Sequence, residues 1–106
     1  MKQLFLLCAC CLTLTPPALL ACQDLAERNG CMQCHQLDHK TVGPAIREIA
    51  KKYAGQPEEV ARLLAKAQNG GGGGLHGVWG QVPMPPNPQV SDADVKVILN
   101  WMLDQK

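Results

Sequence analysis

Cys31-Met32-Gln33-Cys34-His35 is the segment with the strongest chemical signal in this chain of 106 residues. Two cysteines are separated by two residues, and a histidine follows the second cysteine directly. In this C-x-x-C-H arrangement the two thiols can add to the two vinyl groups of a haem, and the histidine can bind the iron. The motif therefore predicts one covalently bound haem c per chain, attached through Cys31 and Cys34, with His35 as an axial ligand.

Two other kinds of site share a C-x-x-C core. A structural zinc site usually needs four nitrogen or sulfur ligands, and without a second C-x-x-C it would have to recruit His39 and His76. A thioredoxin-like dithiol lies in a βαβ pattern, which this sequence lacks. A zinc-stabilised structural module is therefore kept only as a third class of interpretation.

Met84 is the candidate for the second axial ligand. It lies between Pro83 and Pro85, and the fixed φ angles of prolines reduce the entropy that the loop loses on ordering. Met32 lies inside the attachment motif and Met102 lies on the apolar face of an expected helix, so Met84 is preferred to both. A thioether ligand favours reduced iron and so raises the reduction potential.

Apolar periodicity and helix-end signals predict an all-α fold of about four helices around the haem. The expected helices cover residues 23–29, 44–54, 57–68 and 92–104. Asn29-Gly30 is expected to end the first helix, and Ser91 is expected to cap the last. Trp101, within that last helix, is expected to be ordinary core packing.

A long irregular segment joins the last two expected helices. Residues 70–74 are five consecutive glycines, whereas residues 82–88 contain four prolines and Met84. His76 follows the glycine run and would be a poorly fixed rival ligand. The glycine run is expected to be an insertion whose deletion leaves folding and Met84 ligation intact, since glycines bury no apolar surface and lose much entropy on ordering.

Residues 1–21 have the pattern of a secretory signal peptide, with Lys2 followed by an apolar stretch at residues 4–14. Cleavage after Ala21 would leave one domain at residues 22–106 and place it in the periplasm. The sequence ALLAC at residues 18–22 also fits a lipoprotein signal, in which Cys22 carries a lipid anchor. Soluble and lipid-tethered forms are therefore both open.

Composition restricts the function further. The formal net charge is +1, and removal of Lys2 would balance the acidic and basic side chains, so nothing indicates a nucleic-acid partner. Three cysteines follow residue 21, an odd number that disfavours a fold held together by disulfides alone. A domain this small buries little core by itself, and a haem would fill its interior.

Several further motifs extend the C-x-x-C-H signal along nearly all of residues 22–106. They are GCMQCH at 30–35, VGPA at 42–45, GVWG at 77–80, VPMPPN at 82–87 and NW at 100–101. Together they resemble the bacterial cytochrome c-551 family, also called cytochrome c8. The resemblance implies a small class I cytochrome c fold and a monomeric periplasmic shuttle of single electrons. Its implied donor is a cytochrome bc-type complex, and its implied acceptor is a nitrite reductase, a peroxidase or an oxidase.

The resemblance also implies roles for residues around the haem. The carbonyl of Pro44 would accept a hydrogen bond from His35 Nδ1, the Trp79 indole would donate to a haem propionate, and the Asn87 amide would lie near the Met84 sulfur. Lys66 takes the place of an arginine that the family often has near the propionates.

With His35 and Met84 both bound, the iron has no position for a substrate. The expected function is therefore electron transfer without enzymatic activity. The alternative is an open-site haem protein such as a peroxidase or a gas sensor. Lys40, Lys51 and Lys52 would orient an acidic redox partner or would simply be solvated surface residues.

Overall fold

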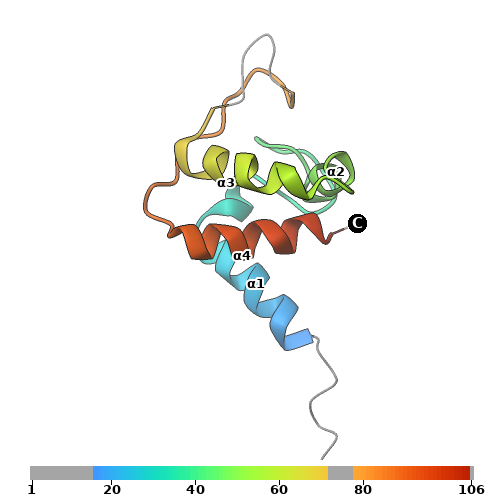
Figure 1. The fold of residues 1–106 in the computed structure, drawn as a ribbon, viewed down its shortest axis with the longest axis vertical. Helices are drawn as coiled ribbons and strands as arrows, with labels where there is room; N and C mark the ends of the chain where they lie inside the picture. Colours follow the sequence, from blue (N-terminus) through green and yellow to red (C-terminus); the bar gives the residue numbers. More distant parts are fainter. Residues whose placement is uncertain (1–15, 72–77, 106) are drawn as a thin grey trace, which may run out of the picture.

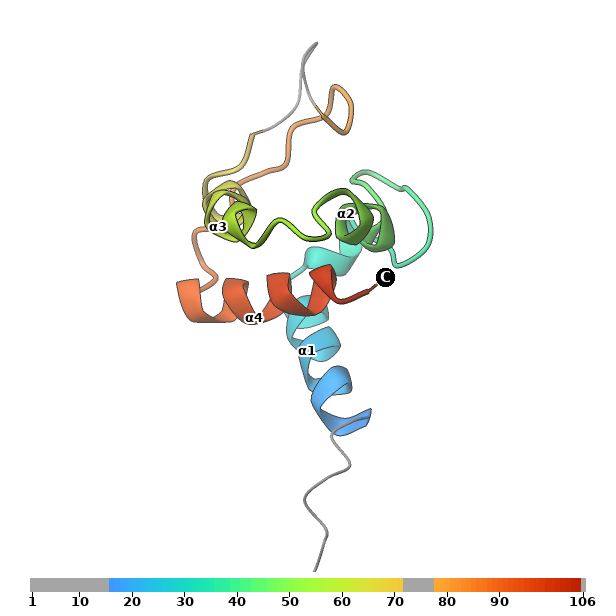
Figure 2. The same ribbon diagram turned by 45° about the vertical axis from the view of Figure 1, so that its right-hand side comes forward.

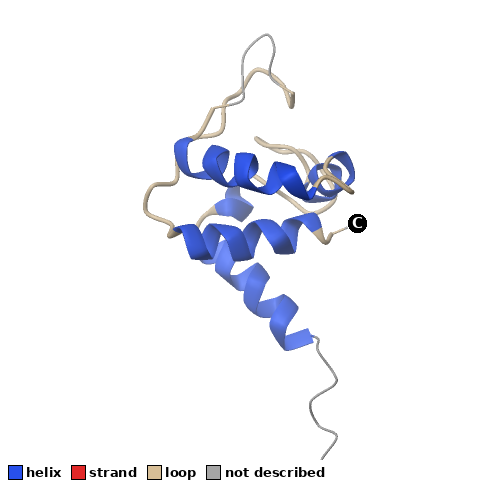
Figure 3. Ribbon diagram, viewed as in Figure 1, coloured by secondary structure: helices blue, strands red, loops and turns tan. Residues whose placement is uncertain are grey.

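A computed structural model of the chain describes residues 16–71 and 78–105. The described residues form four α-helices, two short 3₁₀ turns and no strand (Figure 3). The helices are α1 (Pro16–Arg28), α2 (Ile46–Lys52), α3 (Val60–Asn69) and α4 (Asp92–Leu103), and the turns are η1 (Cys31–Gln33) and η2 (Pro57–Glu59). The predicted all-α fold is confirmed.

Helix α1 ends where the sequence predicts but begins earlier. Gly30 adopts a left-handed φ of 80° and its N–H donates to Glu27 O at 3.1 Å, which ends the helix. The expected start at residue 23 is wrong, because the helix is continuous from Pro16 through Cys22.

Helix α2 is shorter than expected at both ends. Pro44 precedes the helix, and Ala45 is the N-cap with extended backbone. The N–H groups of Ile46 and Arg47 donate to the carbonyls of Gln36 and Leu37 at 2.8 and 3.1 Å. The loop that follows the C-x-x-C-H motif therefore satisfies the free N–H groups of this helix end and attaches α2 to the motif.

The other two helices follow the sequence closely. The expected helix at 57–68 opens as the 3₁₀ turn η2 at Pro57 and continues as α3 to Asn69. At the start of α4, the Ser91 side chain accepts a hydrogen bond from Asp94 N at 3.2 Å, so the predicted cap is confirmed.

Helix α4 is central to the packing and contacts each of the other three helices. Figures 1 and 2 show α4 crossing α1 on one side, with α2 and α3 on the other. Its buried side chains are Val95, Ile98, Leu99, Trp101 and Met102, and this confirms Trp101 as core packing. Within the described part of the chain, no helix is long and apolar enough to cross a membrane.

Candidate haem site

The predicted haem-binding residues converge on one pocket. Its walls include Cys31, Cys34, His35, Pro44, Lys66, Trp79, Met84 and Asn87, together with apolar side chains of α2, α3 and α4. One pocket thus holds both attachment cysteines, His35 and Met84 within largely apolar walls, which suits a haem.

Cys22 does not line the pocket. Its half-buried side chain instead packs against the core cluster that includes Ala26, Ile46 and Trp101. Among the described residues, no three His, Cys, Asp or Glu side chains gather into a group that could hold a metal ion. His76 lies outside the described residues, and so does most of the glycine run.

The C-x-x-C-H segment is folded into a compact turn. The N–H groups of Cys34 and His35 both donate to Cys31 O, at 3.3 and 3.0 Å. The carbonyl of Cys34 in turn accepts from Gly43 N and from the Thr41 hydroxyl, each at 2.8 Å. Burial raises the pKa of the Cys31 thiol, which favours the neutral form before any thioether is made.

His35 is held in an orientation suited to binding iron. It is buried, and its Nδ1 lies 2.9 Å from the carbonyl oxygen of Pro44. A carbonyl can only accept, so Nδ1 carries the proton and Nε2 keeps a free lone pair. A side chain on Gly43 would put its Cβ 2.7 Å from Cε1 of the ring, so the absence of a side chain there makes room for His35. This donor set fits a haem iron.

The Met84 loop is attached to the end of α3. Gly71 and Met84 exchange two backbone hydrogen bonds, both of 2.9 Å. Asn87 N donates to Gln68 O at 3.0 Å, and Asn87 Nδ2 donates to Ala67 O at 2.9 Å. The Met84 side chain forms part of the pocket wall.

Two contacts of this loop go beyond what the sequence predicts. The Asn87 amide nitrogen donates to the carbonyls of Ala67 and Pro85, so it ties the loop to α3. The glycine run is not inert at its start, because Gly70 and Gly71 contact the Met84 loop directly. The dispensability of the run stays a prediction, and these contacts argue against it for Gly70 and Gly71.

Sequence reasoning missed a group of side chains at the edge of the pocket near Trp79. Lys52 Nζ lies 5.8 Å from the ring centres of both Tyr53 and Trp79. Arg62 lies over Tyr53 and its Nη2 is 3.3 Å from the tyrosine hydroxyl. Hydrogen bonds to Glu59 and Tyr53 raise the pKa of Arg62, so it stays protonated.

Helical spacing offers one signal for this cluster. Arg62 lies one turn before Lys66 on α3, and both line the pocket. Nothing local in the sequence predicts the contact between Lys52 and Trp79, because the two residues lie on different segments.

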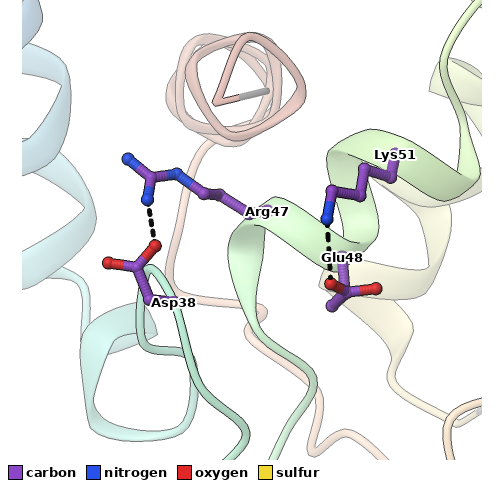
Figure 4. A network of polar contacts seen from close by, with 4 residues as sticks. All are labelled: Asp38, Arg47, Glu48 and Lys51. Carbon is purple, nitrogen blue, oxygen red and sulfur yellow. Dashed lines mark hydrogen bonds and ion pairs between the residues drawn. The ribbon is translucent and has the colours of Figure 1, made fainter.

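The two neighbouring lysines of α2 differ in their contacts. Figure 4 shows Lys51 paired with Glu48, at 3.4 Å, on the exposed side of the helix, and Arg47 paired with Asp38. Lys51 is therefore an ordinary solvated ion-pair residue, whereas Lys52 is engaged with aromatic rings at the pocket edge.

Comparisons with known proteins agree with this geometry. A sequence model of the family "Cytochrome c" matches residues 21–106. Cytochrome c-552 of Nitrosomonas europaea is 49% identical over 83 residues, which cover 78% of this chain and 77% of that protein. Cytochrome c-551 of Allochromatium vinosum is 45% identical over 87 residues, covering 82% and 88%. The crystal structure of wild-type Nitrosomonas europaea cytochrome c552 superposes with a TM-score of 0.72 at 48% identity, covering 79% of this chain and 99% of that one.

Proposed function

The chain belongs to the cytochrome c family, and on that basis we propose that it is a periplasmic single-electron carrier whose haem iron is bound by His35 and Met84. One covalently bound haem c and a role in electron transfer, without enzymatic activity, follow from the family. The axial ligands, the cellular location and the redox partners are the proposed part.

Each residue of the C-x-x-C-H segment has a separate task in holding the haem. Cys31 and Cys34 would hold the haem covalently, each as a thioether to one of its two vinyl groups. His35 presents Nε2 to the iron, while Pro44 fixes the ring through Nδ1. When bound, the haem supplies an iron that alternates between its ferric and ferrous states.

The observation that carries the proposal is the placement of Met84. It shares the pocket with His35, and reciprocal hydrogen bonds to Gly71 fix its backbone. A ligand on a fixed loop keeps the same position in both oxidation states, which keeps the reorganisation on electron transfer small. Ligands from both His35 and Met84 would leave no open position for a substrate.

An open-site peroxidase or gas sensor needs a different pocket. A peroxidase requires an acid–base residue beside the open position. Among the described lining residues, His35 is the only histidine, and it is assigned to the iron. The charged lining residues are Arg62 and Lys66, which carry hydrogen-bond donors only, and the hydroxyl of Tyr53 accepts a hydrogen bond from Arg62. Electron transfer is therefore the function we propose.

The propionates of the haem would lie at the Trp79 edge. Trp79, Lys66 and Arg62 all line the pocket and supply an indole N–H and two cations. We assign Trp79 and Lys66 to the propionates as donors, and add Arg62, which the sequence analysis did not consider. Opposite charges next to a carboxylate lower its pKa and keep it ionised.

The proposal includes export of the chain to the periplasm. Residues 1–21 would direct the chain to the periplasm, and Cys22 would either begin a soluble protein or carry a lipid. Mass spectrometry of the mature N-terminus distinguishes the two forms.

The donor would be a cytochrome bc-type complex and the acceptor a nitrite reductase, a peroxidase or an oxidase, with the carrier acting as a monomer. Val42, Val78 and Val82 are exposed apolar residues around the pocket and would contact such partners.

Replacing methionine with leucine tests the proposal with a matched control. Met84→Leu removes the sulfur at nearly constant volume, and Met102→Leu makes the same change at a buried methionine of α4 that also lines the pocket. We expect Met84→Leu to lose the thioether-to-iron absorption band of the ferric protein and to lower the reduction potential. Met102→Leu should keep both. A Met84→Leu protein with an unchanged spectrum would contradict Met84 ligation.

A further inference from the structure

Gly70 ends α3 in a conformation that side chains rarely adopt. Its φ is 75° and its ψ is −172°, and its N–H donates to Lys66 O at 2.7 Å. A positive φ by itself explains a glycine at a helix end. The surroundings of Gly70 add a second requirement.

The Met84 loop packs directly on the α-carbon of Gly70. A Cβ at this position would lie 2.5 Å from Met84 O, 2.8 Å from Pro86 N and 3.1 Å from Pro85 C. All three are backbone atoms, and two belong to prolines with fixed φ, so the loop cannot move aside by a simple rotamer change. Any side chain at residue 70 would push the loop away from α3.

The neighbouring contacts set the register of the same loop. Gly71 pairs with Met84 through both backbone hydrogen bonds, and Asn87 N donates to Gln68 O. The segment from Met84 to Asn87 thus runs along the last turn of α3, and Gly70 lies between the two points of attachment. The distance between this segment and α3 determines where the Met84 side chain enters the pocket.

We propose that Gly70 is a positioning residue for Met84: the missing side chain lets the loop pack against α3 at the distance that brings the sulfur to the iron. This inference rests on the proposed ligation by Met84. It assigns the first glycine of the run a role in setting axial ligation, in addition to its role in ending the helix.

A second glycine provides a matched control. Gly55 has a φ of 72°, close to that of Gly70, but a Cβ there would meet nothing within 4 Å. Gly55→Ala therefore controls for placing a side chain at a positive φ, and only Gly70→Ala also crowds the Met84 loop. The readouts are the thioether-to-iron band of the ferric holoprotein, the reduction potential and carbon monoxide binding by the ferrous form.

We expect Gly70→Ala to lose the thioether band at neutral pH, to lower the potential and to bind carbon monoxide rapidly. Gly55→Ala should retain the band, the potential and the closed site. A Gly70→Ala protein that keeps its band would overturn the inference and leave Met84 ligation intact. A wild-type protein without the band would instead overturn the proposed function, and this inference with it.

If Gly70→Ala yields no haem protein, amide hydrogen exchange tests whether the Met84 loop is held against α3. In the wild-type holoprotein, the N–H groups of Met84 and Gly71 should exchange slowly and with the same protection, because they form one reciprocal pair of hydrogen bonds. Met84 should lose its protection at the same denaturant concentration as the thioether band is lost. A freely exchanging Met84 amide would show that the loop is not held against α3, and would overturn the inference.

Discussion

Replacing Gly43 with alanine is the sharpest test of how this fold orients its proximal histidine. The new Cβ would lie 2.7 Å from His35 Cε1, 2.9 Å from His35 Nδ1 and 3.1 Å from Cys34 O. Real Cβ atoms essentially never approach a neighbour within 3.0 Å, so the ring or the backbone must move. His35 is attached through Cys34 on one side and hydrogen-bonded to Pro44 on the other, so it has little room to yield.

The loss of stability expected for Gly43→Ala follows from two effects. Overpacking a core costs about 1–3 kcal/mol, and losing the His35–Pro44 hydrogen bond costs about 0.5–1.5 kcal/mol. Together they suggest a loss of roughly 2–4 kcal/mol, which in a domain of this size lowers the melting temperature by on the order of 8–30 °C. A weaker hydrogen bond at Nδ1 also makes the imidazole a poorer donor to iron. We expect the reduction potential to rise as a result.

Thermal unfolding of the ferric holoprotein and redox titration measure these two effects. Val42→Ala is the control, since Val42 is the neighbouring residue and its side chain is 56% exposed. It should change the melting temperature little and leave the potential nearly unchanged. If Gly43→Ala melts like the wild type and has the same potential, the close packing of Gly43 against the His35 ring is not what orients the ligand.

The remaining predictions concern the Trp79 edge. Trp79→Phe should raise the propionate pKa, because the ionised carboxylate loses a donor, and should move the pH dependence of the reduction potential to higher pH. Lys66→Ala should shift the same redox titration curve in the same direction, and unchanged curves in both would remove these residues from the propionates. Lys52→Gln should destabilise the holoprotein by about 0.5–1 kcal/mol in thermal unfolding, the value of an exposed cation–π contact. Lys51→Gln removes the same charge from a surface ion pair and should cost less, so equal losses would argue against the Lys52–Trp79 contact.

The sequence predicted those features that depend on neighbours along the chain. Ser91 and Asp94 lie three residues apart, so the cap of α4 could be recognised from spacing alone. The C-x-x-C-H segment places both attachment cysteines and the proposed ligand His35 within five consecutive residues. Met84 could be selected because two prolines flank it.

Contacts between distant segments could not be predicted in the same way. The glycine run suggested a loose insertion, but Gly70 and Gly71 contact residues that follow them by more than ten positions. Asn87 likewise donates its amide hydrogen to the carbonyl of Ala67, which lies 20 positions earlier in the chain. Such pairings depend on how the loop closes over the end of α3, and a local pattern does not encode that closure.

The contact between Lys52 and Trp79 could not be predicted because a lysine side chain reaches far from its own helix. Lys52 belongs to α2, and its ammonium group lies over the ring of Trp79, 27 positions later in the chain. A lysine at a helix end is read from sequence as a solvated charge that favours the helix C-terminus. Only the packing of α2 beside the Trp79 turn shows that it faces an aromatic ring.

Exposure of the ferrous wild-type protein to carbon monoxide at neutral pH tests the central claim most directly. A carrier with His35 and Met84 both bound has no free position on its iron, so the ferrous spectrum should stay unchanged on mixing. Met84→Leu should form the carbon monoxide complex at once under the same conditions. Rapid binding by the wild-type protein would contradict the closed iron site and favour an open-site haem protein.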